Sequence, residues 1–256
     1  MVYMKIVSWN VWVLNANGVG NLKRLIEEEP ADVYCLQEVT ADMLEYIHDT
    51  KLHGLDYIYC FDYRKFKDGY YQNYFLVLLS KHEIHNTKMN RIHVNHLTRS
   101  SLWDWIMRWD ESIEFQYADI QVEKQWYRIF NCHLEVSAGP ELRLRQFEQC
   151  VERFKPESRN IVCGDLNIYA RPKWNWFLWW VMGFKLREIG VNEREKFEER
   201  FRELGLQNVF LGENTFEERK LQLDHILIPR EMSVRGKKLI HDNYGSDHQP
   251  IAVETN

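Results

Sequence analysis

The 256-residue sequence has few residues that break or crosslink a chain: six prolines, twelve glycines and five cysteines. No stretch rich in Pro, Gly or Ser divides it, so we expect a single domain over residues 1–256. The cysteines are odd in number, and no pair has the close spacing of a thiolate metal site. We therefore expect small buried thiols and a reducing, cytoplasmic compartment.

Three further features are missing. Met1 leads into a predicted strand without a charged segment and an apolar core, so we expect no secretory signal. The longest aromatic run, residues 174–184, is too short to span a bilayer. The 33 basic side chains do not outnumber the 38 acidic ones, and the formal charge is −5. Any surface that binds a polyanion must therefore be local.

The sequence does contain seven short polar islands, spread from one end to the other. Most of them end or begin an apolar run rich in Ile and Val, which is typical of a buried strand. Polar side chains at the ends of such strands are expected to converge at one rim of a sheet. The islands are Ser8-Trp9-Asn10, Leu36-Gln37-Glu38, residues 131–135, Arg143 with Gln146, residues 164–167, Leu223-Asp224-His225 and Ser246-Asp247-His248.

Strand patterns and helix patterns are mixed along the chain. Periodicity predicts helices over residues 22–30, 41–48, 140–156 and 193–204. Strands are predicted over residues 4–7, 32–36, 56–61, 71–79, 115–122, 126–132, 160–163 and 226–228. Consecutive strands exclude a simple alternating parallel fold. We expect an α+β fold in which two sheets pack together with helices outside.

The islands contain the groups that hydrolysis of a phosphate ester requires. Such a site must neutralise phosphoryl charge, deprotonate a water and stabilise the leaving oxygen. Glu38, with Asn10 beside it, offers hard oxygen ligands of the kind that Mg²⁺ or Mn²⁺ prefers. The sequence has no Cys/His cluster of the type that binds zinc. We therefore expect a hard divalent cation at Asn10 and Glu38.

The remaining islands provide acid, base and donor groups. Asp165 is a carboxylate that can act as general base, and the Asn167 carboxamide can hold the water or a phosphoryl oxygen. His133 and His248 can donate to the transition state. Two further carboxylates can orient these imidazoles, and they are Asp224 and Asp247.

The ordered motifs Trp-Asn, Gln-Glu, His-Leu-Glu, Gly-Asp-Leu-Asn, Leu-Asp-His and Ser-Asp-His resemble those of the endonuclease/exonuclease/phosphatase superfamily. The resemblance runs from Ser8 to Pro250. It implies the four-layered αββα sandwich of DNase I and a metal-dependent phosphoric ester hydrolase.

By matching position, the resemblance implies a metal site at Asn10 and Glu38. It also implies that Asp165, with Asn167 beside it, aligns or deprotonates the attacking water. It also implies that two histidines contact the phosphoryl group. They are His133, and His248 paired with Asp247. The resemblance further implies that Asp224 supports a histidine or the metal. Arg143 and Gln146 are implied as supporting residues, which either anchor their helix near the site or lie closer to the reacting groups.

The island at His133-Leu134-Glu135 separates branches of this superfamily. Apurinic-site endonucleases usually carry a Tyr-Val-Pro-Asn type motif there, so the chain resembles the branch of DNase I, sphingomyelinases, inositol polyphosphate phosphatases, deadenylases and tyrosyl-DNA phosphodiesterases. One departure stands beside this resemblance. Tyr74 and Phe75 replace the small residues that many members have ahead of the corresponding strand.

Two tryptophan-rich inserts, near residues 97–110 and 171–184, fall between predicted core strands. They can pack together as a small satellite core. They can also stack unpaired bases beside basic groups, or lie in a membrane interface. The candidate substrate-binding residues in them are Trp103, Trp105, Arg171, Trp174 and Trp176.

The leading hypothesis is a Mg²⁺-dependent nuclease that hydrolyses phosphodiester bonds in nucleic acid, with DNA favoured, by in-line attack of an activated water. A phospholipid or inositol-phosphate phosphoesterase is the alternative, and for it a lipid membrane surface would be the partner. A tyrosyl-DNA phosphodiesterase-like repair enzyme is a further alternative. A non-catalytic binding module is least favoured, because every expected catalytic position is filled. No obligate protein partner is inferred.

Overall fold

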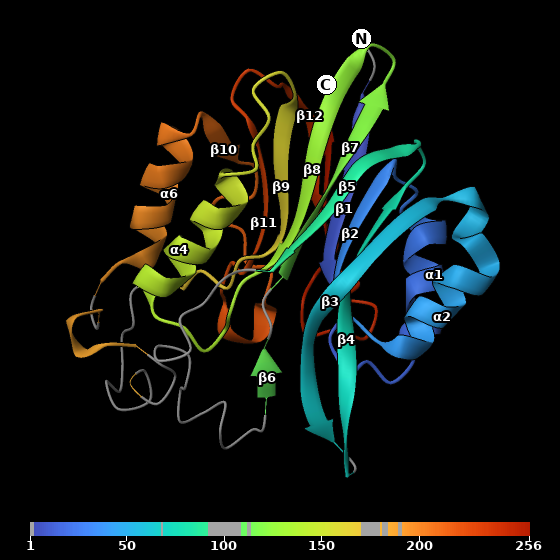
Figure 1. The fold of residues 1–256 in the computed structure, drawn as a ribbon, viewed down its shortest axis with the longest axis horizontal. Helices are drawn as coiled ribbons and strands as arrows, with labels where there is room; N and C mark the ends of the chain where they lie inside the picture. The colour runs from blue at the N-terminus through green and yellow to red at the C-terminus, as the bar shows by residue number, and fades with distance from the viewer. Residues whose placement is uncertain are drawn as a thin grey trace.

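The computed structural model describes residues 3–67, 69–91, 109–111, 114–169, 180, 184–188 and 191–256. Within these ranges, two β-sheets pack face to face and helices cover both outer faces (Figure 1). The result is a four-layered αββα arrangement. The predicted α+β sandwich is confirmed.

The first sheet combines strands from the two ends of the chain. Its inner pair, β1 and β2, is parallel, and its other pairs are antiparallel. Helices α1 (Gly18–Glu28) and α2 (Ala41–Thr50) cover its outer face with apolar side chains such as Leu22 and Met43. The strand order is β12 (Val234–Leu239), β13 (Ile251–Thr255), β1 (Met4–Asn10), β2 (Val33–Val39), β4 (Tyr70–Ser80), β3 (Asp56–Lys67) and β6 (Trp109–Glu111).

The second sheet is built from the middle and later parts of the chain. Its pair β8 and β9 is parallel. Helices α4 (Pro140–Val151) and α6 (Glu193–Glu203) pack on its outer face through Phe147, Phe197 and Phe201. The strand order is β10 (Leu206–Asn208), β11 (Asp224–Pro229), β9 (Arg159–Asp165), β8 (Gln125–His133), β7 (Glu114–Val122) and β5 (Ile84–Arg91). Short 3₁₀ helices span Lys51–Gly54, Leu186–Glu188 and Glu217–Arg219.

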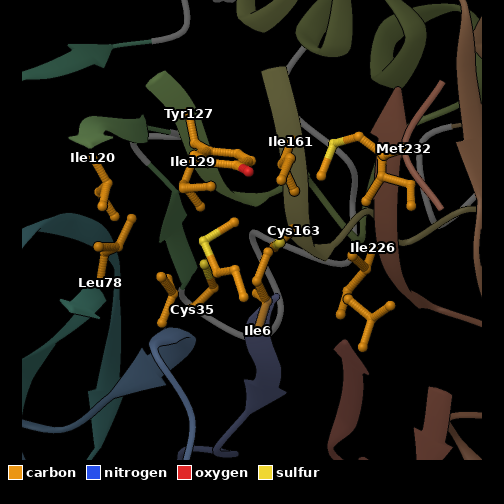
Figure 2. Close-up of a cluster of buried hydrophobic side chains, with 14 of the residues drawn as sticks. Ile6, Cys35, Leu78, Ile120, Tyr127, Ile129, Ile161, Cys163, Ile226 and Met232 are labelled. Atoms are coloured by element: carbon orange, nitrogen blue, oxygen red, sulfur yellow. The ribbon is translucent and has the colours of Figure 1, made fainter. Parts of the chain in front are cut away.

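The main core lies between the two sheets. Alternate residues of facing strands meet there, among them Ile6, Cys35, Ile129 and Cys163 (Figure 2). β-branched side chains fit this pleated surface well, and small thiols fill the gaps between them. All five cysteines are buried, as the sequence predicts, and none forms a disulfide.

The structure departs from the sequence-based prediction at several elements. Helix α4 ends at Val151 instead of near residue 156, because Arg153 and Phe154 close tighter turns onto the carbonyls of Cys150 and Val151. Strands β5, β6, β10, β12 and β13 were not predicted. Strand β12 is almost wholly exposed, so it has no apolar alternation to reveal it. Among the described residues, no helix is long and apolar enough to cross a membrane.

Candidate active site

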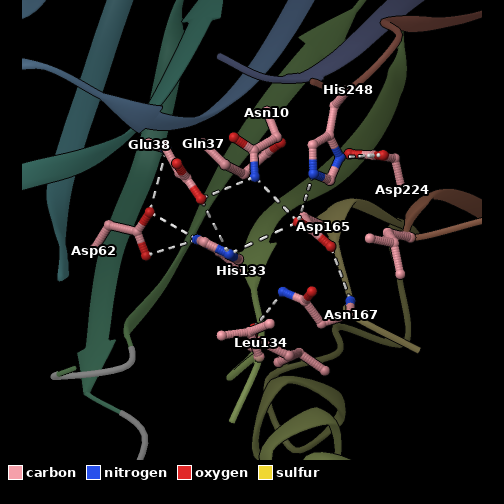
Figure 3. A network of polar contacts seen from close by, with 12 residues as sticks. Asn10, Gln37, Glu38, Asp62, His133, Leu134, Asp165, Asn167, Asp224 and His248 are labelled. Atoms are coloured by element: carbon pink, nitrogen blue, oxygen red, sulfur yellow. Dashed lines mark hydrogen bonds and ion pairs between the residues drawn. The ribbon is translucent and has the colours of Figure 1, made fainter. Parts of the chain in front are cut away.

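The polar islands meet at one rim of the sandwich. Parallel pairing of β1 with β2 brings Asn10 beside Gln37, and parallel pairing of β8 with β9 brings His133 beside Asp165. Parallel strands end at the same edge of a sheet, so the residues that follow their apolar runs face one another. Figure 3 shows these side chains pointing into one shared space between the two sheets.

Asp165 lies at the centre of this group. Its Oδ2 atom accepts a hydrogen bond from Asn10 Nδ2 at 3.1 Å. The same oxygen lies 3.8 Å from Nε2 of His133 and 3.8 Å from Nε2 of His248. Its Oδ1 atom accepts from the backbone N–H of Asn167 at 2.9 Å. One oxygen is thus fixed by the backbone, and the other faces both imidazoles.

The backbone around the rim is held in uncommon conformations. Glu38 has a φ of 59° and Asn167 a φ of 49°, both in the left-handed region. Non-glycine residues adopt such φ values at a cost, and they concentrate at functional sites. Gly164, directly before Asp165, has a φ of 133°. All three positions lie in or directly beside β2 and β9, the strands that carry Glu38 and Asp165.

Glu38 faces Asp165 from the first sheet. Its Oε1 atom accepts from Asn10 Nδ2 at 3.2 Å, and its Oε2 atom accepts from the backbone N–H of Val13 at 3.0 Å. Burial, and then the charge of Asp62, raises the pKa of Glu38, although His133 opposes this rise. Asn10 thus donates to both carboxylates and holds them side by side.

Asp62 is a site residue that the sequence analysis missed. Its Oδ2 atom lies 2.9 Å from Nδ1 of His133, and it also accepts from the backbone N–H of Glu38 at 3.2 Å. Asp62 is buried, with 4% of its surface exposed. The signal that could have revealed it is a carboxylate between two aromatic residues of β3, Phe61 and Tyr63.

Asp62 also sets the protonation of His133. Burial lowers the pKa of the imidazole, but the carboxylate of Asp62 and the charges of Asp165 and Glu38 together raise it further than burial lowers it. The net pKa is well above the usual value. The three carboxylates around His133 therefore favour its protonated form.

His248 has Asp224, and not Asp247, as its hydrogen-bond partner. Asp224 Oδ2 lies 2.8 Å from His248 Nδ1, whereas Asp247 Oδ1 lies 3.9 Å from His248 Nε2. Burial lowers the pKa of His248, but the charges of Asp224, Asp165 and Asp247 raise it to about 10. Burial raises the pKa of Asp247 itself to about 6. The expected pairing of His248 with Asp247 is replaced because Asp224 occupies the Nδ1 side of the ring.

The carboxamide of Asn167 points away from the space between the imidazoles. Its Nδ2 atom donates to the carbonyl of Leu134 at 2.9 Å, which ties the β9 end to the His-Leu-Glu segment. The contact between Asn167 and Asp165 is made by the backbone N–H instead. Asn167 therefore fixes the position of Asp165.

Arg143 and Gln146 lie on the inner face of α4, behind the site. Arg143 is fully buried and forms a two-point ion pair with Glu193, at 2.7 and 3.0 Å. It also donates to the carbonyls of Glu135 and Val136. Gln146 donates to the Glu135 carboxylate at 2.9 Å and accepts from its backbone N–H at 3.2 Å. Both residues therefore anchor the segment that follows His133.

Replacing Arg143 with Met should destabilise the protein strongly. The change leaves the buried Glu193 carboxylate without its cation, and loss of one partner of a buried ion pair costs about 3–5 kcal/mol. Urea unfolding followed by circular dichroism measures this cost. Lys23→Met is the matched control, since Lys23 and Glu27 form an exposed pair at 3.8 Å. An exposed pair contributes no more than about 1 kcal/mol, so equal losses for the two variants would contradict the role given to Arg143.

His225, although part of a polar island, faces away from Asp165 and toward Phe201. Its Nδ1 atom hydrogen-bonds the carbonyl of Leu223 at 2.8 Å. Burial, and then the charge of Arg194, lowers its pKa to about 3. His225 is therefore neutral in the folded protein at any pH above this value.

His225 should make the fold acid-sensitive. Between its unfolded pKa, near 6.5, and its folded pKa of about 3, only the unfolded chain binds the proton, so stability falls as the pH drops through this window. At pH 5 the loss should be about 2 kcal/mol. His225→Asn keeps a donor for the Leu223 carbonyl but does not titrate. Urea unfolding at pH 7.5 and pH 5 should therefore show a smaller loss in this variant, and an equal loss would refute the assignment.

Five candidate substrate-binding residues belong to the two tryptophan-rich inserts. Trp103, Trp105, Arg171, Trp174 and Trp176 lie outside the described residues. At the edge of the second insert, Phe184 is buried and packs with Tyr169 and Leu223.

The donor set fits a hard divalent cation. Around Asp165, carboxylates outnumber imidazoles, and Oδ1 of Asp224 and Oδ1 of Asp247 are buried without a hydrogen-bond partner. Buried carboxylates without enough protein cations are typical of a metal site. Among the described residues, one group has ligand atoms within 4.8 Å of one another: Asp165, Asp224 and His248. Glu38 and Asn10 border the same space from the opposite side.

A family comparison identifies the chain. A model of the endonuclease/exonuclease/phosphatase family matches residues 7–248, which is most of the sequence. The chain belongs to this family. No curated protein matches it closely enough to narrow the assignment. The family's matched region contains every island at the rim.

Solved structures of this family have the same fold. An endonuclease/exonuclease/phosphatase from Beutenbergia cavernae aligns with a TM-score of 0.73 and 12% identity, covering 100% of this chain and 72% of that one. TDP2 from D. rerio, complexed with a single-strand DNA product, aligns with a TM-score of 0.62 and 15% identity, covering 100% of each chain. The 3′ phosphatase NExo from Neisseria, bound to a product DNA hairpin, aligns with a TM-score of 0.66 and 17% identity, covering 99% of each chain. At these identities the similarity shows the DNase I-like fold alone.

Proposed function

We propose that this member of the endonuclease/exonuclease/phosphatase family is a Mg²⁺-dependent phosphodiesterase acting on nucleic acid, with DNA as the favoured substrate. The observation that carries the proposal is the position of Asp165, whose Oδ2 atom faces two histidines at 3.8 Å. Two structural neighbours with this fold were solved with DNA products. Their DNA complexes support nucleic acid over lipid as the substrate.

The proposed reaction assigns a role to each group at the rim. Asp165 accepts the proton of the attacking water, because its Oδ2 atom is the carboxylate oxygen that faces both imidazoles. His133 and His248 donate to the phosphoryl oxygens, since Asp62 and Asp224 hold their Nδ1 atoms and leave both Nε2 atoms facing Asp165. Glu38, with Asn10 beside it, would hold a divalent cation, which would supply neutralisation of the phosphoryl charge. Asn167, Arg143 and Gln146 keep these groups in place.

Hydrolysis of a DNA oligonucleotide in ¹⁸O-labelled water tests this proposal. With Mg²⁺ present, one solvent oxygen should enter the product phosphate, because water is the nucleophile. EDTA should abolish the reaction and added Mg²⁺ should restore it. Absence of EDTA-reversible hydrolysis across nucleic acid substrates would rule the proposed function out.

Glu38→Gln should weaken metal binding. The change removes the negative charge that a hard cation requires but keeps an acceptor for the Asn10 carboxamide. We expect the Mg²⁺ or Mn²⁺ dissociation constant, measured by calorimetry, to rise at least about tenfold. Asp224→Asn is the matched comparison, because Asp224 belongs to the alternative ligand group with Asp165 and His248. A larger loss of affinity in Asp224→Asn would place the metal on the other side of Asp165.

A further inference from the structure

The β3–β4 hairpin extends well beyond the rim that carries the site. Strand β2 ends at Val39, which pairs with Phe75 of β4, whereas β4 begins at Tyr70. Residues 70–74 and their partners in β3 therefore project past the end of the neighbouring strand. Figure 1 shows this hairpin, labelled β3 and β4, reaching below the other labelled strands. The hairpin thus forms an arm beside the site.

One face of this arm begins at the site itself. The ring of Tyr63 lies 6.1 Å from that of His133 and 5.0 Å from that of Tyr74. The Tyr74 hydroxyl donates to Gln72 Oε1 at 3.1 Å, and Gln72 Nε2 donates to the Tyr70 hydroxyl at 3.3 Å. Tyr63, Tyr74, Gln72 and Tyr70 thus form a continuous row, which we call the inner strip. It leads from the catalytic imidazole to the tip of the arm.

The inner strip is buried at its two inner rings and exposed at its outer ring. Tyr74 has 2% of its surface exposed, Tyr63 has 9% and Tyr70 has 59%. The inner end is therefore a fixed wall, and the outer end presents an aromatic ring to solvent. This also explains the bulky Tyr74 found where many members of the superfamily have small residues. Tyr74 supports the strip instead of blocking it.

Strand β3 brings basic residues to the arm of an acidic chain. Arg64 and Lys65 follow one another in β3, while the whole chain has a formal charge of −5. Lys65 pairs with Gln72 in the strand register, so the two side chains leave the sheet on the same face. A positive charge therefore accompanies the inner strip. A phosphodiester backbone is negatively charged and is therefore attracted to this side chain.

We propose that the inner strip binds a single-stranded segment of nucleic acid next to the scissile phosphate. A base stacks on the ring of Tyr70, and a backbone phosphate lies beside Lys65. Aromatic rings accompanied by cations are the combination that binds unpaired nucleotides, because every base has a face that can stack. Bases inside a continuous duplex have no free face for Tyr70. This inference rests on the proposed nuclease function and narrows it to unpaired substrates.

The opposite face of the arm offers a matched control. Tyr71 is 48% exposed, close to the exposure of Tyr70, but it points away from the strip. Its ring packs on Phe66 at 5.3 Å, and the Arg64 guanidinium lies 4.7 Å above it. Tyr70→Ala and Tyr71→Ala therefore remove the same side chain from opposite faces of the same hairpin.

The test compares steady-state kinetics on two substrates with Mg²⁺. One is a single-stranded DNA oligonucleotide, and the other is bis(p-nitrophenyl) phosphate, which reaches only the site. Tyr70→Ala should raise KM for the oligonucleotide about tenfold and leave hydrolysis of the small diester unchanged. Tyr70→Phe should retain most of the affinity, because the ring still stacks. Tyr71→Ala should change neither substrate.

Each other outcome has a distinct meaning. Equal KM values for Tyr70→Ala and Tyr71→Ala would overturn the inference while leaving the proposed function intact. An equal effect of Tyr70→Ala on a blunt duplex would also overturn it, since stacking on unpaired bases would not explain that effect. If the wild-type protein hydrolyses the small diester but no nucleic acid, both the proposed function and this inference fail.

Discussion

Asp165→Asn should lower turnover of a DNA diester by about 10³-fold or more. The carboxamide has nearly the same shape as the carboxylate, so it can still accept the backbone N–H of Asn167. It cannot take a proton from water, and removal of a general base costs about 10²–10⁴-fold. It also removes the negative charge that faces His133 and His248 at 3.8 Å. The rate loss should therefore lie at the upper end of that range.

The control for this variant is Asp242→Asn, which neutralises a surface carboxylate paired with Arg24. Turnover of this control should equal that of the wild type. Circular dichroism and a thermal melt of Asp165→Asn should show a folded protein. Near-normal turnover of a folded Asp165→Asn protein would contradict the assignment of the base.

Gly164→Ala should destabilise the fold severely. A Cβ atom at this position would lie 1.8 Å from the carbonyl oxygen of Cys132, on the neighbouring strand β8. The obstacle is backbone, so no side chain can move aside, and the φ of 133° is unfavourable for any residue with a Cβ. We expect a loss of more than about 4 kcal/mol in urea unfolding, or insoluble protein.

Gly236→Ala is the matched glycine control. A Cβ atom at Gly236, in the exposed strand β12, would meet no atom within 4 Å. Stability should change by less than about 0.5 kcal/mol, as for other surface substitutions. A Gly164→Ala protein as stable as Gly236→Ala would show that the close approach of β8 and β9 does not restrict this position.

The sequence predicts the fold class and most of the site because both depend on local pattern. Apolar runs rich in Ile and Val define β1, β2, β8, β9 and β11, and the polar residues at their ends lie at the rim. The order of the motifs then indicates the family. These signals need no knowledge of long-range contacts.

Other features depend on contacts that a pattern does not encode. Asp62 joins His133 across the two sheets, a separation of 71 residues along the chain. The choice between Asp224 and Asp247 as the partner of His248 depends on which side of the ring each carboxylate reaches. The inner strip depends on the irregular register of β3 and β4 between Phe61 and Arg64, which brings Tyr63 next to His133. None of these three contacts leaves a repeating pattern in the sequence from which it could be predicted.

The most direct test of the account is a Mg²⁺-dependent activity panel on the purified protein. It should cover single- and double-stranded DNA, RNA, phosphotyrosyl-DNA, sphingomyelin and inositol phosphates, with Asp165→Asn assayed in parallel. We predict hydrolysis of nucleic acid, fastest on single-stranded DNA, that EDTA abolishes and Asp165→Asn lacks. Hydrolysis of sphingomyelin or inositol phosphates without hydrolysis of any nucleic acid would contradict it.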